Sequence, residues 1–257
     1  MKVRTLFALA LLLVAATVLS FSQGLYWESS TTSPMLKQTL RSTFSYMPGM
    51  MRQASAENGT ATVFRLDKKL ILSIDDRKKT YSEMSFDEIE SMMKKKSDGM
   101  GRQMEAMKEK MKDMPEEQRK MMEKALGGAM PGSTPDVPVT VTRSPESKSI
   151  SGYACTQYIV RQGEKTIMTI WATKDIAGYA AMQKDLSDFG RRLASMNPVN
   201  GKTMAEAMKQ VVGFPVLTQI GETLTTTVLK VESRTTSADA FEVPKGYQMT
   251  PSPYIQP

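Results

Sequence analysis

The sequence has no histidine and only one cysteine among its 257 residues. Without histidine, a Ser-His-Asp or Cys-His catalytic arrangement is impossible, and so is a zinc site built on imidazole. No Gly-rich phosphate loop, paired-cysteine motif or lysine-bearing nucleotide motif occurs either. A carboxylate pair could still do acid–base work, but Asp75 and Asp76 lie in a turn pattern, where acidic residues are common for structural reasons. We expect a protein that is not an enzyme and carries no cofactor.

The single cysteine also excludes an internal disulfide, so the fold must be stabilised by its core. Cys155 lies in the alternating stretch Tyr153–Val160. This pattern favours a small apolar core residue over a reactive or pairing thiol.

Long apolar runs are absent beyond the first 22 residues. At the N-terminus, Lys2 and Arg4 precede an apolar run from Leu6 to Leu19, which the small residues Ser20 and Ser22 follow. This pattern predicts a signal peptide over residues 1–22. The alternative is a retained anchor, but the run is shorter than the roughly 20 residues that cross a bilayer. We expect a periplasmic or secreted protein after cleavage.

A strong charge imbalance is also missing. The chain has 34 basic and 27 acidic residues, a net charge of +7, and no basic cluster with interleaved aromatics. Nucleic acid is therefore not an expected partner. The mild positive excess is compatible with transient contact with an anionic membrane surface.

What the sequence does contain is two sets of strand patterns. Ala61–Leu66 and Leu70–Ile74 read as a hairpin, and a second turn leads to Thr80–Ser82. Strand patterning returns at Val139 and continues through Tyr153–Val160. These segments predict antiparallel meanders on either side of a helical region.

The helical region begins at Ser85, where Ser85 and Glu88 have the spacing of a capping box. We expect a methionine-rich helical insertion over residues 85–126, broken at Gly99 and Gly101 into two or three pieces. Residues 127–138, rich in Gly and Pro, predict a flexible linker.

A second helix is expected from Tyr179 to Met196, because its apolar residues recur at steps of three and four. Together the patterns predict a single α+β domain over residues 23–257.

Five of the 22 methionines form a stripe at helical spacing: Met100, Met104, Met107, Met111 and Met114. The stripe has three interpretations. It packs on the sheet as core, it lies over a cavity and contacts a hydrophobic ligand, or its thioethers bind Cu(I). The absence of histidine leaves the sulfurs without support for a copper site.

The order of several segments resembles a known family. The segments are Tyr26-Trp27-Glu28, Tyr46-Met47-Pro48-Gly49-Met50-Met51-Arg52, Arg65-Leu66-Asp67-Lys68-Lys69, Lys79-Thr80-Tyr81-Ser82-Glu83-Met84, Ile150-Ser151-Gly152-Tyr153-Ala154-Cys155, Trp171-Ala172-Thr173, Gly213-Phe214-Pro215 and Phe241-Glu242-Val243-Pro244-Lys245-Gly246-Tyr247. Together they resemble the bacterial domain-of-unknown-function family 4412.

The resemblance implies an exported protein, similar in fold to the periplasmic lipoprotein carriers. It implies a curved antiparallel sheet, an incomplete barrel, whose mouth is covered by helices. The family supplies no functional residue, and this chain lacks the lipidated N-terminal cysteine of its lipoprotein members.

We therefore expect a non-catalytic periplasmic protein that binds a lipid, an acyl chain or the tail of a lipid-modified protein. The expected ligand-binding residues are the five methionines of the stripe. The alternatives are a Cu(I)-binding methionine-rich protein and a structural envelope protein without a ligand.

Overall fold

The computed structural model of the chain describes residues 22–35, 38–55, 57–112, 115, 118, 137–196 and 201–252. The expected signal peptide, apart from its last residue, lies outside the described residues. So does the expected linker up to residue 136.

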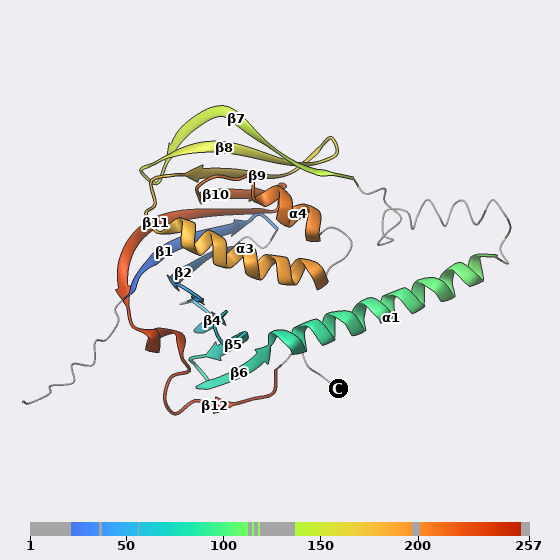
Figure 1. Cartoon of the computed structure of the whole chain (residues 1–257), viewed down its shortest axis with the longest axis horizontal. Helices are drawn as coiled ribbons and strands as arrows, with labels where there is room; N and C mark the ends of the chain where they lie inside the picture. Colours follow the sequence, from blue (N-terminus) through green and yellow to red (C-terminus); the bar gives the residue numbers. More distant parts are fainter. Residues whose placement is uncertain are drawn as a thin grey trace, which may run out of the picture.

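Within these residues, twelve strands form one curved sheet (Figure 1). The strands are β1 (Ser22–Ser33), β2 (Gln38–Met47), β3 (Met50–Ser55), β4 (Thr60–Arg65), β5 (Leu70–Asp75), β6 (Thr80–Ser85), β7 (Val139–Ile150), β8 (Tyr153–Gln162), β9 (Lys165–Thr173), β10 (Phe214–Ile220), β11 (Leu224–Thr236) and β12 (Gln248–Met249). Their order is β12-β6-β5-β4-β3-β2-β1-β11-β10-β9-β8-β7. The protein is thus mostly β-sheet, and the open curved sheet fits an incomplete barrel.

The two expected meanders are joined side by side in this sheet. β1 pairs with β2 on one edge and with β11 on the other, both antiparallel. The hairpins expected around β4, β5 and β6 are confirmed, with Val63 opposite Leu72 and Ile74 opposite Tyr81. The short β12 differs from the expected antiparallel pattern, because it pairs in parallel with β6.

The described helices are α1 (Phe86–Lys112), α3 (Tyr179–Met196), α4 (Gly201–Met208) and the short 3-10 helix η1 (Ala238–Phe241). The capping box that opens α1 is confirmed. The Glu88 amide donates to the Ser85 hydroxyl at 3.1 Å, and the Glu88 carboxylate accepts from the Ser85 amide at 2.7 Å.

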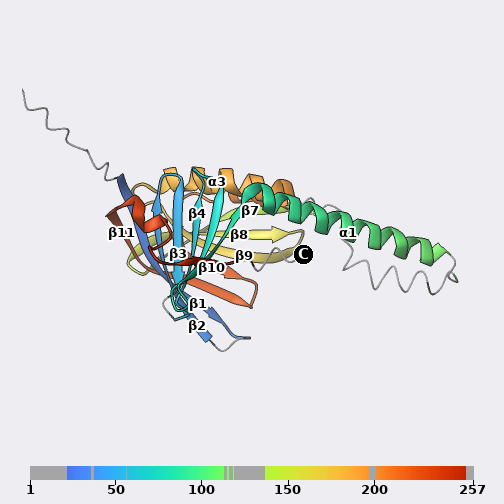
Figure 2. The same ribbon diagram turned by 90° about the horizontal axis from the view of Figure 1, so that it is seen from below.

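The expected breaks at Gly99 and Gly101 are wrong, because α1 runs through both as one helix. A helical glycine costs roughly 1 kcal/mol relative to alanine, but it keeps its amide hydrogen bond, which proline would lose. Past its first turns α1 extends beyond the edge of the sheet (Figures 1 and 2).

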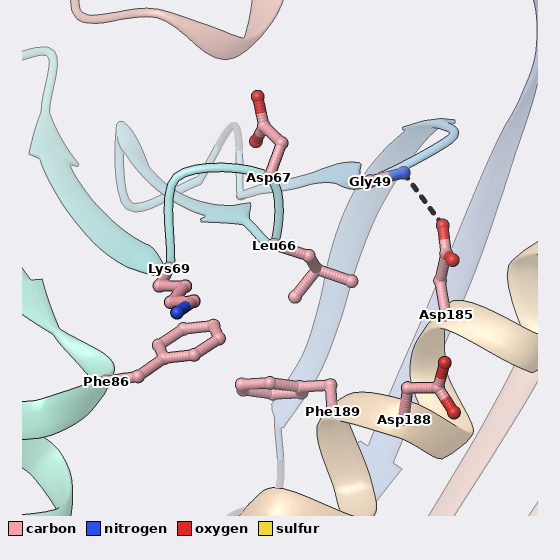
Figure 3. A pocket seen from close by; sticks show the side chains of 8 residues that line it. All are labelled: Gly49, Leu66, Asp67, Lys69, Phe86, Asp185, Asp188 and Phe189. Carbon is pink, nitrogen blue, oxygen red and sulfur yellow. Dashed lines mark hydrogen bonds between the residues drawn. The ribbon is translucent and has the colours of Figure 1, made fainter.

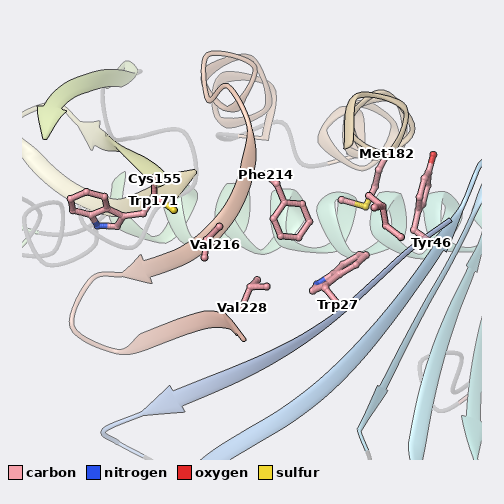
Figure 4. Close-up of a cluster of buried hydrophobic side chains, with 9 residues drawn as sticks. Trp27, Tyr46, Cys155, Trp171, Met182, Phe214, Val216 and Val228 are labelled. Atoms are coloured by element: carbon pink, nitrogen blue, oxygen red, sulfur yellow. The ribbon is translucent and has the colours of Figure 1, made fainter. Parts of the chain in front are cut away.

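The main core lies between α3 and the middle of the sheet (Figure 4). Phe214 of β10 makes edge contacts with Trp27 of β1 at 5.7 Å and with Tyr179 of α3 at 5.3 Å between ring centroids. Met182 of α3 joins the same cluster and is 2% exposed. The protein's own side chains therefore fill the space between α3 and β1 and β10.

Cys155 belongs to this cluster and is buried and free, which confirms its expected core position. Burial also raises the pKa of its thiol, so the residue has the character of a small apolar side chain.

A second contact covers the opposite face of β4. Because side chains alternate along a strand, Phe64 contacts α3 while Val63 and Arg65 lie on the other face. There, Phe241 of η1 is fully buried and Arg65 is paired with Asp67 and Glu242. This contact fastens the C-terminal segment to the sheet.

Among the described residues, no helix combines the length and the apolar character that crossing a membrane requires.

Candidate functional site

Two pockets lie on different faces of α3. One, which we call the acidic pocket, has a volume of about 300 Å³ and lies between α3, the start of α1 and two hairpin turns. The other, which we call the apolar pocket, has a volume of about 330 Å³ and lies between α3, α4 and β10. At 100° per residue, Asp185 and Phe189 share one helix face, and Leu186 and Gly190 point to another.

The acidic pocket is shown in Figure 3. Its lining residues are Gly49, Leu66, Asp67, Lys69, Phe86, Asp185, Asp188 and Phe189.

The central polar group of the acidic pocket is Asp185. Its carboxylate accepts a hydrogen bond from the Tyr46 hydroxyl at 2.8 Å. It also accepts one from the Gly49 amide at 2.7 Å (Figure 3). Burial and the bond to Asp185 both raise the pKa of Tyr46, so this hydroxyl stays protonated and keeps donating. The carboxylate thus ties α3 to the β2–β3 turn.

The other carboxylates of the acidic pocket are also paired with the protein. The Asp67 carboxylate accepts two hydrogen bonds from the Arg65 guanidinium, one from Nε at 2.9 Å and one from Nη2 at 2.7 Å. Asp188 pairs with Lys184 and Arg191, and these cations lower its pKa.

The floor of this pocket is aromatic. Phe189 of α3 lies 5.2 Å from Phe86 of α1 and 5.6 Å from Phe64 of β4, between ring centroids. Such contacts are worth about 0.5–1.5 kcal/mol each beyond the burial of area. The side chains of the acidic pocket therefore connect α1, α3 and the sheet to one another.

The apolar pocket has a different lining. Its described lining residues are Tyr179, Gln183, Leu186, Ser187, Gly190, Arg191, Met208, Lys209, Val211 and Pro215. Leu186, Met208 and Val211 give it aliphatic and thioether walls. The ring of Tyr179 is half-buried, and this desolvation raises the pKa of its hydroxyl to about 12 and keeps it neutral.

The charged residues that line the apolar pocket, among those described, are Arg191 and Lys209, and both are cations. Their side chains are 58% and 42% exposed. Arg191 pairs with Asp188, and Lys209 lies 2.6 Å from Glu206. The pocket thus combines apolar walls with basic groups that reach solvent.

Gly190 is a gap in the wall of the apolar pocket. A Cβ atom built on this residue would have no heavy atom within 4 Å other than those of its chain neighbours and of the helix backbone around it. The glycine is therefore not required by the packing of the protein around it.

Four of the five methionines of the stripe lie on α1 and not on α3 or α4. Met100, Met104, Met107 and Met111 are on α1, and Met114 lies outside the described residues. Of the five, only Met107 has a described side chain, which is half-buried and lines neither pocket. The assignment of the stripe to ligand binding stays a prediction.

In the part of the chain that the structure describes, no three His, Cys, Asp or Glu side chains gather closely enough to hold a metal ion.

Comparisons with known proteins give one informative match. No curated protein sequence matches the chain. Two structures of PNGF-II, in space groups C2 and P21, align with TM-scores of 0.38 and 0.39 at 8% and 7% identity. The alignments cover 90% of this chain in both cases and 31% and 32% of PNGF-II, so the chain spans about a third of that protein's length. The model of the domain of unknown function DUF4412 matches residues 88–247, and the chain therefore belongs to this family.

Proposed function

We propose that this chain is an exported, periplasmic, non-catalytic protein that binds a hydrophobic ligand in the apolar pocket between α3 and α4. The ligand is a lipid, an acyl chain or the lipid tail of another protein. The observation that carries the proposal is the pocket itself, where Leu186, Met208 and Val211 line an opening of about 330 Å³.

The size of the pocket limits what it can hold. Ligand pockets span roughly 300–1,000 Å³, so this one suits a short acyl chain or the end of a longer one. Each buried methylene contributes about 0.8 kcal/mol, so a chain of about a dozen carbons gains about 10 kcal/mol before the costs of association. With association costs of about 4 kcal/mol, about 6 kcal/mol remains, which corresponds to a Kd of tens of micromolar.

The proposed place of action follows from the sequence. The basic, apolar and small-residue pattern of the first 22 residues supports export. The open curved sheet, with α3 packed on one face through Met182, supports a likeness to the periplasmic lipoprotein carriers. In this proposal α3 and α4 act as the helices that cover the mouth of the incomplete barrel.

The test is ligand capture by the full chain, expressed with its signal and purified without detergent. Native mass spectrometry should show a co-purified lipid, and a fluorescent fatty acid should bind with micromolar affinity. The blocking variant is Gly190→Leu, whose side chain would enter the open space of the pocket. We expect it to lose at least about tenfold in affinity, because it displaces several ligand methylenes.

The matched control is Gly99→Leu in α1. This residue is also a helical glycine with open space around it, and it lines neither pocket. The control should bind as the wild type does. Equal binding by Gly190→Leu and the wild type would place the ligand outside the apolar pocket.

A structural envelope protein without a ligand is the second candidate. It is favoured by the filled core, in which Trp27, Phe214 and Met182 occupy the space below α3. Absence of co-purified lipid together with no fatty-acid binding would select this candidate over the first.

A further inference from the structure

We propose that the apolar pocket selects an anionic amphiphile, with its carboxylate or phosphate between Arg191 and Lys209 and its apolar chain along Leu186, Met208 and Val211. This inference rests on the proposed function and names the ligand class of the same pocket. It depends on how charge and open space are distributed around α3.

The two cations come from different elements that meet at the pocket. Arg191 lies on α3, and Lys209 follows directly after α4. Both line the same pocket, whose other described lining residues are uncharged. A charged group placed among these side chains therefore meets positive charge from two sides.

Their existing ion pairs do not prevent this role. Asp188 lies three residues before Arg191 on α3, and Glu206 of α4 lies three residues before Lys209. The side chains of Asp188 and Glu206 are 45% and 65% exposed. Exposed pairs of this kind contribute little, with a typical range of 0–1 kcal/mol. An anionic headgroup can therefore share or replace these partners at small cost, and Arg191 offers several donors in a planar fork.

Comparison with the acidic pocket supports a preference of the apolar pocket for an anion. That pocket presents Asp67, Asp185 and Asp188 against a single cation, Lys69. The described linings of the two pockets thus differ in the sign of their net charge, which directs an anionic amphiphile to the apolar pocket.

Gly190 supplies a second, independent observation. Within a helix, glycine costs roughly 0.5–1 kcal/mol of stability relative to alanine. At position 190 an added Cβ atom would meet no packed neighbour, so packing does not explain the glycine. The open space lies beside Arg191 in the wall of the pocket. A ligand chain that passes this position to bring its headgroup to Arg191 accounts for the glycine.

The test compares three ligands with the same twelve-carbon chain: dodecanoate, dodecyl phosphate and dodecanol, each titrated calorimetrically into the full chain below its aggregation concentration. We expect both anions to bind about tenfold more tightly than the alcohol, as one charge-assisted contact implies. The ratio of the two anions distinguishes a carboxylate from a phosphate headgroup.

The variants Arg191→Gln and Lys209→Gln should each reduce the preference for the anions over dodecanol about threefold or more. The control is Lys184→Gln, which removes the same charge from α3 and the other cation of Asp188 but does not line the pocket. The Lys184→Gln variant should keep the preference for the anions over dodecanol. A further salt titration should weaken binding of the anions and not of the alcohol.

The outcomes separate this inference from the proposed function. If all three ligands bind equally, or if Lys184→Gln acts as Arg191→Gln does, the anionic selection is wrong and the hydrophobic site stands. If none of the three binds, the proposed function itself fails.

Discussion

The two pockets beside α3 are similar in volume and opposite in chemistry. In the acidic pocket, Asp185 is bonded to Tyr46 and Gly49, and Asp67 is bonded to Arg65. In the apolar pocket, the walls are apolar, the cations are held only by exposed partners, and Gly190 leaves space unfilled. A pocket whose polar groups are used by the protein itself holds the fold together. A pocket whose groups are free to change partner can hold a ligand.

The largest effect expected from this comparison is on stability, through the acidic pocket. Asp185→Ala leaves the buried Tyr46 hydroxyl and the Gly49 amide without their acceptor. Bonds to a charged acceptor are worth about 1.5–3 kcal/mol, so we expect a loss of about 3 kcal/mol in the free energy of unfolding, measured with urea.

The matched control is Asp188→Ala, which has the same change of residue on the same helix. Its carboxylate pairs only with the exposed cations Lys184 and Arg191 among the described residues. Exposed ion pairs contribute little to stability, so the urea midpoint of Asp188→Ala should stay close to that of the wild type. Equal losses of unfolding free energy in the two variants would contradict the role of Asp185 in tying α3 to the β2–β3 turn.

The second effect appears at alkaline pH and involves Tyr179, the first residue of α3. Burial raises the pKa of Tyr179 from 10 to about 12. The unfolded chain therefore releases this proton at lower pH than the folded chain does. The resulting stability is fully present below pH 10 and is lost as the pH rises through 12.

Tyr179→Phe removes this ionisation. At pH 11.5 the variant should be about 2 kcal/mol more stable relative to the wild type than it is at pH 8, as urea unfolding at both values would show. Tyr46→Phe provides the contrast, because it also loses a hydrogen bond to Asp185 and should destabilise the protein already at pH 8. A Tyr179→Phe variant with the same pH profile as the wild type would show that this ring is not buried.

A smaller effect is expected at the gap in the apolar pocket. Gly190→Ala should raise the free energy of unfolding by about 0.5–1 kcal/mol, because alanine is the better helix former and its methyl group meets no neighbour. Gly101→Ala has equal space, but Gly101 is an exposed residue of α1, the helix that extends beyond the edge of the sheet (Figure 1). If α1 opens locally before the sheet unfolds, a change there should leave the urea midpoint of global unfolding unchanged. Destabilisation by Gly190→Ala would mean that the space is not open.

The sequence predicted the elements better than the site. Period-two patterns located β4, β5 and β6, and the Ser85 capping box located the start of α1, because these signals are local. The pairing of β1 with β11 joins residues about 200 positions apart, and no local pattern reports it.

The apolar pocket was missed for a similar reason. The spacing of Tyr179, Met182 and Leu186 predicted a single apolar face on α3. In the structure, Met182 enters the core while Tyr179 and Leu186 also line the pocket, because α4 approaches that side of the helix. The available signal was Gly190 beside Arg191 within an otherwise regular helix. Its meaning depends on the space around it, which only the fold supplies.

The smallest effect is expected from the methionine stripe, and it separates the stripe from the apolar pocket. The variant Met104→Leu, Met107→Leu, Met111→Leu keeps apolar character, and leucine and methionine have similar helix propensity. If the ligand lies between α3 and α4, fatty-acid affinity should change by less than about twofold, since leucine for methionine conserves volume and hydrophobicity. A Cu(I)-binding protein would instead lose its metal, because leucine has no sulfur ligand. Parallel titrations with fluorescent fatty acid and with Cu(I) measure both. A loss of fatty-acid binding would favour α1 over the apolar pocket as the place of the ligand, because the described lining residues of the pocket are unchanged.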